Sequence, residues 1–92
     1  MIRSFRNTVT EKVFQQVSVK QFRAIQKVAL RKLIHIARAR SLRDLAAIPG
    51  NCLEPLRGNR KGQHSIRIND QYRICFTWQD GDAYDVEIVD YH

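Results

Sequence analysis

The spacing of apolar residues changes once along this 92-residue chain, and the change constrains the fold more than any other feature. From Ser18 onward, apolar side chains recur at every third or fourth position, as on the buried face of an α-helix of about five turns. The stripe consists of Phe22, Ile25, Ala29, Leu33 and Ile36, widened by Leu30, Ile34 and Ala37. From His64 onward the period becomes two, which is typical of β-strands.

Three segments carry the period of two: "HSIRI", "YRICFTW" and "AYDVEIVDY". The turn-forming pairs Asn69-Asp70 and Asp80-Gly81 separate them, so we expect an antiparallel meander. In the last segment the alternation predicts one face formed by Tyr84, Val86 and Ile88, and an opposite face of Ala83, Asp85, Glu87, Val89 and Tyr91.

The other predicted elements are short. "MIRSF" is typical of a strand, "TEKVFQQ" begins like a helix with Thr10 as its N-cap, and "SLRDLAAIPG" predicts a helix capped by Ser41. Asp44 lies at the third helical position, where a carboxylate suits the helix dipole. We therefore expect one α+β domain, residues 1–92, in which an N-terminal strand and helices pack on a twisted, mainly antiparallel sheet.

Positive charge is concentrated in the first half of the chain. The total of 16 Lys and Arg against 9 Asp and Glu gives +7, but residues up to 43 contain a single acid, Glu11. This balance favours a polyanionic partner such as nucleic acid or the ribosome. The alternative is a solvated basic helix without a ligand.

A second group of cations lies between residues 57 and 73. It consists of Arg57, Arg60, Lys61, Arg67 and Arg73. Arg67 and Arg73 fall on facing strands of one hairpin, away from the apolar Ile66 and Ile74. Two guanidinium groups with polar neighbours suit a phosphate, although an ordinary solvated sheet face would carry the same pattern.

Other sites find little support. Cys52 and Cys75 form no C-x-x-C motif, so we expect two reduced thiols, and no Cys or His cluster has zinc spacing. "DGDAYD" lacks the spacing of a calcium loop and predicts a hairpin turn, and His35 is expected to be a packing or capping residue. We expect neither an export signal nor a membrane span, since no window approaches 18 apolar residues.

The final letters "DYH" offer groups for RNA cleavage without a metal. In that chemistry the 2′-hydroxyl attacks its own phosphate in line, helped by a base, an acid for the leaving 5′-oxygen and nearby cations. Asp90, Tyr91 and His92 would supply such groups if the last strand runs beside Arg67 and Arg73. Composition alone does not select this chemistry.

The segments "PLRGNRKGQHSIRINDQYRICFTW" and "GDAYDVEIVDYH" resemble the HigB family of toxins, especially its GraT-like branch, within the RelE/ParE superfamily. "MIRSF" fits too, and the resemblance covers essentially the whole chain. It implies a compact RelE-like fold, a cytoplasmic type II toxin, and a cognate HigA-type helix-turn-helix antitoxin that binds it in a hetero-oligomer. We expect the free toxin to be a monomer, because the sequence has no large apolar stripe left over for a second copy. It also implies cofactor-free, ribosome-dependent cleavage of mRNA in the A site.

The resemblance assigns roles to individual residues. Arg73 matches the arginine that holds the scissile phosphate, Tyr91 or His92 is the acid or base, and Asp90 orients or balances charge. RNA or phosphate binding falls to Arg57, Arg60, Lys61, Arg67 and Gln71, of which Gln71 replaces a common Asn. Ribosomal RNA would contact the basic helix at Lys20, Arg23, Lys27, Arg31 and Lys32.

Two departures from the family pattern bear on activity. Glu54 stands where well-studied members have His, and Arg57 stands where many have Lys. A carboxylate repels an anionic substrate, so we leave Glu54 out of the catalytic set and expect a milder nuclease. Two other functions stay open: a ParE-like inhibitor of DNA gyrase, and a non-enzymatic module that binds ribosomal or other RNA.

Overall fold

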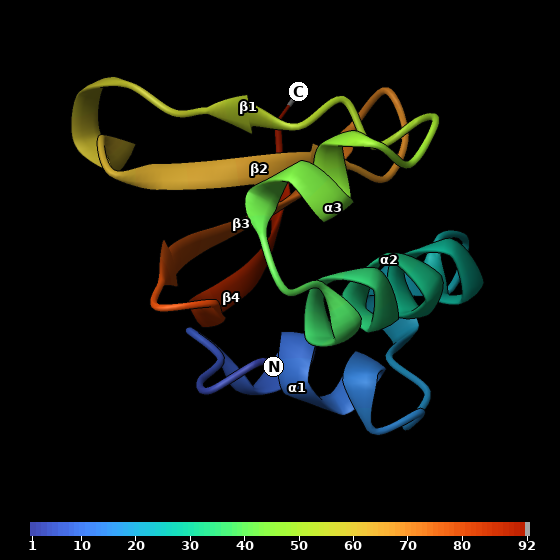
Figure 1. Cartoon of the computed structure of the whole chain (residues 1–92). Helices are drawn as coiled ribbons and strands as arrows, with labels where there is room; N and C mark the ends of the chain where they lie inside the picture. The colour runs from blue at the N-terminus through green and yellow to red at the C-terminus, as the bar shows by residue number, and fades with distance from the viewer. Residues whose placement is uncertain (92) are drawn as a thin grey trace.

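A computed structural model of the protein describes residues 1–91, in which short helices precede a four-stranded sheet (Figure 1). The helical elements are α1 (Thr8–Phe14), the 3₁₀ turn η1 (Lys20–Phe22), α2 (Gln26–Arg38), α3 (Leu42–Ala46) and, between two strands, the 3₁₀ turn η2 (Gly58–Arg60). The strands are β1 (Glu54–Pro55), β2 (Gln63–Arg67), β3 (Tyr72–Gln79) and β4 (Asp82–Asp90).

The sheet is antiparallel throughout its four strands, in the order β1-β2-β3-β4, as the predicted meander requires. The turn at Asp80-Gly81 has positive φ at both residues, which matches the twist of a two-residue hairpin. The N-terminal segment pairs in parallel with β4 through bridges from Ile2 to Ala83 and from Phe5 to Val86. The predicted N-terminal strand is therefore present as two bridges at the sheet edge.

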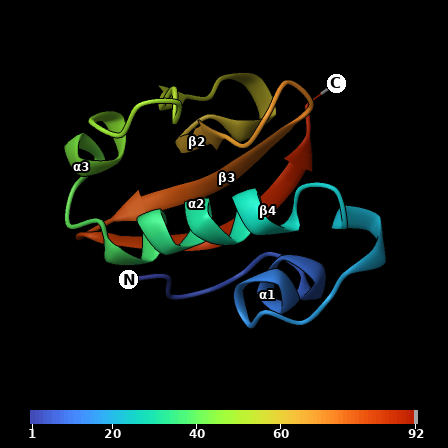
Figure 2. The same cartoon turned by 90° about the vertical axis from the view of Figure 1, so that its right-hand side faces the viewer.

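One layer of helices covers one face of the sheet. α2 lies across β3 and β4, and α1 lies beside it, as Figure 2 shows. The core between the layers is fully buried, and its largest side chains come from both halves of the chain: Val13, Leu33, Ile36, Ile66, Ile74, Phe76 and Val86. The α+β prediction is confirmed.

The long helix expected from Ser18 is interrupted, and this part of the prediction was wrong. The chain forms η1, turns at residues 23–25 and begins α2 only at Gln26, whose side chain accepts from Val19 N and donates to the Val17 carbonyl. Phe22 and Ile25 are buried nonetheless. A 3₁₀ turn also places residues i and i+3 on one side, so the apolar spacing does not distinguish it from a continuous α-helix.

The predicted N-cap is confirmed for α3 and was wrong for α1. Ser41 caps α3 and Asp44 completes the capping box, as predicted. The N-cap of α1 is Asn7 rather than Thr10, because the Asn7 side chain accepts from Thr10 N at 3.0 Å. Thr10 is buried instead, and its hydroxyl accepts from Ile88 N in β4 at 3.0 Å.

A β-bulge corrects the predicted faces of β4. Cys75 pairs with Glu87 but Thr77 pairs with Tyr84, so two residues of β4 oppose Phe76 alone, and Asp85 takes a φ of 53°. Ala83 therefore joins Val86 and Ile88 on the helix-covered face and is fully buried. Tyr84, predicted to share that face, lies on the other one.

Candidate active site

The face of the sheet away from α1 and α2 carries both hairpin arginines. We call it the arginine face; it comprises Ser65, Arg67, Arg73, Cys75 and Glu87. Arg67 and Arg73 are direct partners across β2 and β3, which confirms their predicted position. Ser65 and Cys75 are fully buried, so this is not an ordinary solvated face.

Arg73 is held on several sides. Its Nε donates to Ser65 Oγ at 2.7 Å, and its Nη2 donates to the Cys52 carbonyl at 2.6 Å. The Glu54 carboxylate lies 3.6 Å from Arg73 Nε, and only 14% of the arginine side chain is exposed. A guanidinium fixed in this way is a preorganised anion site, because its remaining donors point in set directions.

The end of β4 brings Tyr91 to the same face. Tyr91 N donates to the Gln71 carbonyl at 2.7 Å, which continues the ladder past β4. The Tyr91 side chain lies close enough to Cys75 to lower the pKa of that thiol, although 43% of the tyrosine is exposed. Burial raises the pKa of the Tyr91 hydroxyl above its usual value; Cys75 and Glu54 add to the rise, and Arg60 and Arg73 oppose it. Tyr91 is consequently a neutral phenol at pH 7.

Asp90 occupies a different position. It pairs with Tyr72, so its side chain starts from the helix-covered face at the exposed end of the strand, where it accepts from Gln71 Nε2 at 3.1 Å. Asp90 and Gln71 thus hold the strand end whose backbone carries Tyr91. The predicted catalytic residue His92 lies outside the described residues.

The predicted phosphate-binding cations are in three environments. Arg60 crosses the face to the Glu87 carboxylate at 3.2 Å and donates to the Gln63 side chain at 3.0 Å. Arg67 forms an ion pair with Asp70. Arg57 and Lys61 are exposed on the connection between β1 and β2.

Glu54 is the site residue that the sequence interpretation left out. It belongs to the edge strand β1, pairs with Ser65 in the register and lies against Arg73, while its charge acts on Tyr91. Its place in the family pattern was the signal that could have identified it. The Glu54 carboxylate from β1, the Arg73 guanidinium from β3 and the Tyr91 phenol just after β4 therefore lie on one face of the sheet.

The basic helix is separate from this cluster. Lys20, Arg23, Lys27 and Arg31 are exposed on η1, α2 and the turn between them, in the helical layer on the other side of the sheet. Lys32 is only 5% exposed, so the prediction of a ribosome contact was wrong for this residue. Its Nζ points inward and donates to Asn51 Oδ1 at 2.6 Å.

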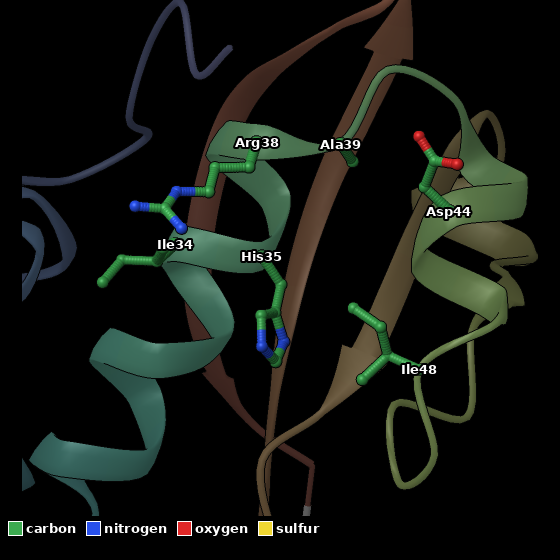
Figure 3. Close-up of a pocket in the computed structure, with 6 residues that line it drawn as sticks. All are labelled: Ile34, His35, Arg38, Ala39, Asp44 and Ile48. Carbon is green, nitrogen blue, oxygen red and sulfur yellow. The ribbon is translucent and has the colours of Figure 1, made fainter.

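A cavity of about 250 Å³ lies between α2 and α3, outside the arginine face. Figure 3 shows its lining, which is formed by Ile34, His35, Arg38, Ala39, Asp44 and Ile48. His35 is partly buried there, and its Nδ1 has no hydrogen-bond partner among the described residues. Burial lowers the pKa of His35, with Lys32 and Arg31 adding to the decrease. No lining residue belongs to the cluster around Arg73.

Both cysteines are free, and burial raises the pKa of the Cys75 thiol, which keeps it protonated. Within residues 1–91, no three His, Cys, Asp or Glu side chains are grouped as a metal site would require. No helix among these residues is long and apolar enough to cross a membrane.

The fold is shared with solved structures of other proteins. A YoeB–YefM complex from Staphylococcus aureus contains a chain that superposes with a TM-score of 0.58 at 18% identity, over 100% of this chain and 98% of that one. A YoeB dimer from the same organism gives a TM-score of 0.61 at 23% identity, over 99% and 94% of the two chains. Both matches cover nearly the whole of this chain and show a shared fold.

The family follows from the sequence match. Residues 3–92 match the family described as "RelE-like toxin of type II toxin-antitoxin system HigB", and the chain belongs to this family. It is 47% identical to Toxin HigB-1 of Vibrio cholerae over 60 residues, which are 65% of this chain and 63% of that protein. It is also 45% identical to Endoribonuclease HigB of Proteus vulgaris over 40 residues, 44% of each. The aligned segments thus span less than two thirds of these relatives.

Proposed function

We propose that this HigB-family toxin is a ribosome-dependent endoribonuclease that cuts mRNA in the A site and so stops translation and growth. The observation that carries the proposal is the meeting of Arg73, Glu54 and Tyr91 on one face. A relative bears the name Endoribonuclease HigB, which supports the same activity. The sheet face would receive the message, and the exposed basic residues of η1 and α2 would contact ribosomal RNA.

The reaction needs no metal. The 2′-oxygen attacks the adjacent phosphorus as its proton passes to a base, and the bond to the 5′-oxygen breaks as that oxygen takes a proton from an acid. The products are a 2′,3′-cyclic phosphate and a 5′-hydroxyl. Arg73 would hold the non-bridging oxygens and stabilise the added charge of the phosphorane, with Arg60 as a second cation.

Tyr91 suits the acid. A tyrosine phenol holds its proton at pH 7 with or without the raised pKa of Tyr91, so it would enter the reaction able to donate that proton to the leaving oxygen. Glu54 is the nearest carboxylate to Arg73 and suits the base, although its charge weakens phosphate binding until the proton is taken. Asp90 would orient the strand end through Gln71.

The partners follow from the family. A type II toxin is neutralised by an antitoxin, and the similar YoeB chain is in a complex with YefM. We therefore propose a cognate HigA-type helix-turn-helix antitoxin, a hetero-oligomer with it, a monomeric free toxin, and action in the cytoplasm.

The test uses labelled mRNA, alone and on ribosomes with an empty A site, with cuts mapped by primer extension. We expect cleavage only on the ribosome, at a much lower but measurable rate in Arg73→Ala. Inhibited translation without any cut would favour a non-enzymatic RNA binder. Unaffected translation together with blocked DNA supercoiling would favour a gyrase inhibitor.

A further inference from the structure

Lys32 is a buried cation in a molecule whose other Lys and Arg residues are largely at the surface. It lies on α2 at 5% exposure, and its Nζ donates to Asn51 Oδ1 at 2.6 Å. Burying an ammonium group is costly, and a methionine or leucine would fill the same space without that cost. The polar contact must therefore be explained by what it holds in place.

Asn51 is the residue that Lys32 holds. It is fully buried, and its side-chain Nδ2 donates to the Leu45 carbonyl at 3.0 Å. The backbone carbonyl of Asn51 accepts from Arg67 N at 2.6 Å. Asn51 thereby ties the end of α3 to β2. With Lys32 added, the helical layer, the loop after α3 and the sheet are joined at one residue, through the side chain of Asn51 to the helices and through its backbone carbonyl to β2.

The next residue along the chain contacts the proposed catalytic arginine. The Cys52 carbonyl accepts from Arg73 Nη2 at 2.6 Å, and Cys52 itself has a φ of 47°, a left-handed conformation that a non-glycine residue adopts only when its neighbours impose it. Two positions further on, Glu54 lies against Arg73. The loop anchored at Asn51 therefore presents both a carbonyl and a carboxylate to one guanidinium.

We propose that Lys32 is a positioning residue: through Asn51 it sets the loop at residues 51–54 and thereby the orientation of Arg73 and Glu54. Lys32 touches no substrate, since it lies in the helical layer and the arginine face is on the far side of the sheet. The inference rests on the proposed function for the role of Arg73. Its structural part, the dependence of the Arg73 side chain on Lys32, does not.

The first experiment separates position from activity. Lys32→Met keeps the volume and removes the ammonium, and Lys12→Met, an exposed lysine of α1, is the matched control. The NMR signal of Arg73 Nε–H, which reports the bond to Ser65 Oγ, is expected to shift or broaden in Lys32→Met and to stay unchanged in Lys12→Met. Should Lys32→Met lack a cooperative melt, Lys32→Gln keeps a shorter donor and provides the same comparison.

The second experiment is a double-mutant cycle on single-turnover cleavage. Misplacing Arg73 is expected to slow wild-type chemistry roughly 10- to 100-fold, with little change in the affinity for ribosomes. In an Arg73→Ala background, Lys32→Met should change the rate less than twofold, because the group it positions is absent.

The outcomes distinguish a failure of the positioning role from a failure of the proposed function. A folded Lys32→Met protein with an unchanged Arg73 signal and wild-type cleavage, or a full additive loss in the cycle, overturns the positioning role. If wild-type protein cuts no RNA, the proposed function fails, and the Arg73 signal still tests the link to Lys32.

Discussion

Tyr91 lies on the arginine face, where four neighbouring groups act on the pKa of its hydroxyl. Burial raises this pKa, Cys75 and Glu54 add to the rise, and Arg60 and Arg73 oppose it. Its backbone is fixed by Gln71, so the hydroxyl is removable without loss of the strand.

Removing that hydroxyl is the first prediction. Tyr91→Phe is expected to slow single-turnover cleavage on ribosomes roughly 100-fold, because the leaving oxygen loses its proton donor. The melting temperature should change little, since 43% of the tyrosine residue is exposed. Wild-type cleavage by Tyr91→Phe would show that another group is the acid.

Glu54, the proposed base, also carries a charge that repels phosphate, and two substitutions separate these two effects. Glu54→Gln should bind an uncleavable RNA analogue more tightly, because one negative charge near Arg73 is gone. It should cleave normal mRNA roughly 100-fold more slowly, because the proposed base is missing. Glu54→His should cleave faster than wild type, since a neutral imidazole accepts a proton without repelling phosphate. A Glu54→His rate at or below the wild-type rate would contradict the idea that this family branch is a milder nuclease.

α3 is a helix of five residues, so its stability depends on its cap and on packing. Ser41→Ala removes the acceptor for Asp44 N and should lower the free energy of unfolding by about 1 kcal/mol in urea titrations. The exposed Ser18→Ala is the control. Equal midpoints for the two variants would mean that packing alone holds α3.

The bulge in β4 decides which of its side chains lie on each face of the sheet. It shifts the strand by one position near Asp85, so Ala83 enters the core and the residues after it keep Glu87 and Tyr91 on the arginine face. Without the extra residue, the side chains at either the start or the end of β4 would point to the opposite face of the sheet.

In the whole molecule, the helical layer contains a histidine that links stability to pH. The pKa of His35 is lowered by burial and by Lys32 and Arg31; Arg38 and Asp44 also line its cavity. The unfolded chain therefore binds a proton at this histidine more readily than the folded protein does. The contribution of neutral His35 to folding stability is present above pH 6.5, the usual pKa of histidine, and is lost as the pH falls through the lowered pKa.

Acidification from pH 7.5 to pH 5 should consequently destabilise the wild-type protein more than His35→Gln, measured as urea midpoints at each pH (about 25 °C). Asp44 and Arg38 stay in place in both proteins, so the comparison isolates the histidine. Parallel curves for the two proteins would show that His35 does not contribute to the acid sensitivity.

Periodicity predicted the class of the fold and the pairing of Arg67 with Arg73, because both follow from local spacing and a two-residue turn. The terminal motif predicted Tyr91 as a site residue, and the structure places it on the arginine face; its role stays a prediction. The prediction for Lys32 was wrong, since a lysine on the flank of an apolar stripe has the same spacing whether it faces water or a buried amide.

The amino-acid order thus determined which faces are apolar and where the chain turns, since those depend on residues a few positions apart. The tertiary structure alone decided the burial of Lys32 against Asn51, 19 positions away, and the contact of Arg73 with Cys52, 21 positions away. It also decided the bulge and the approach of Glu54 to Arg73. Such contacts depend on how the two layers pack, and short-range spacing contains no information about that.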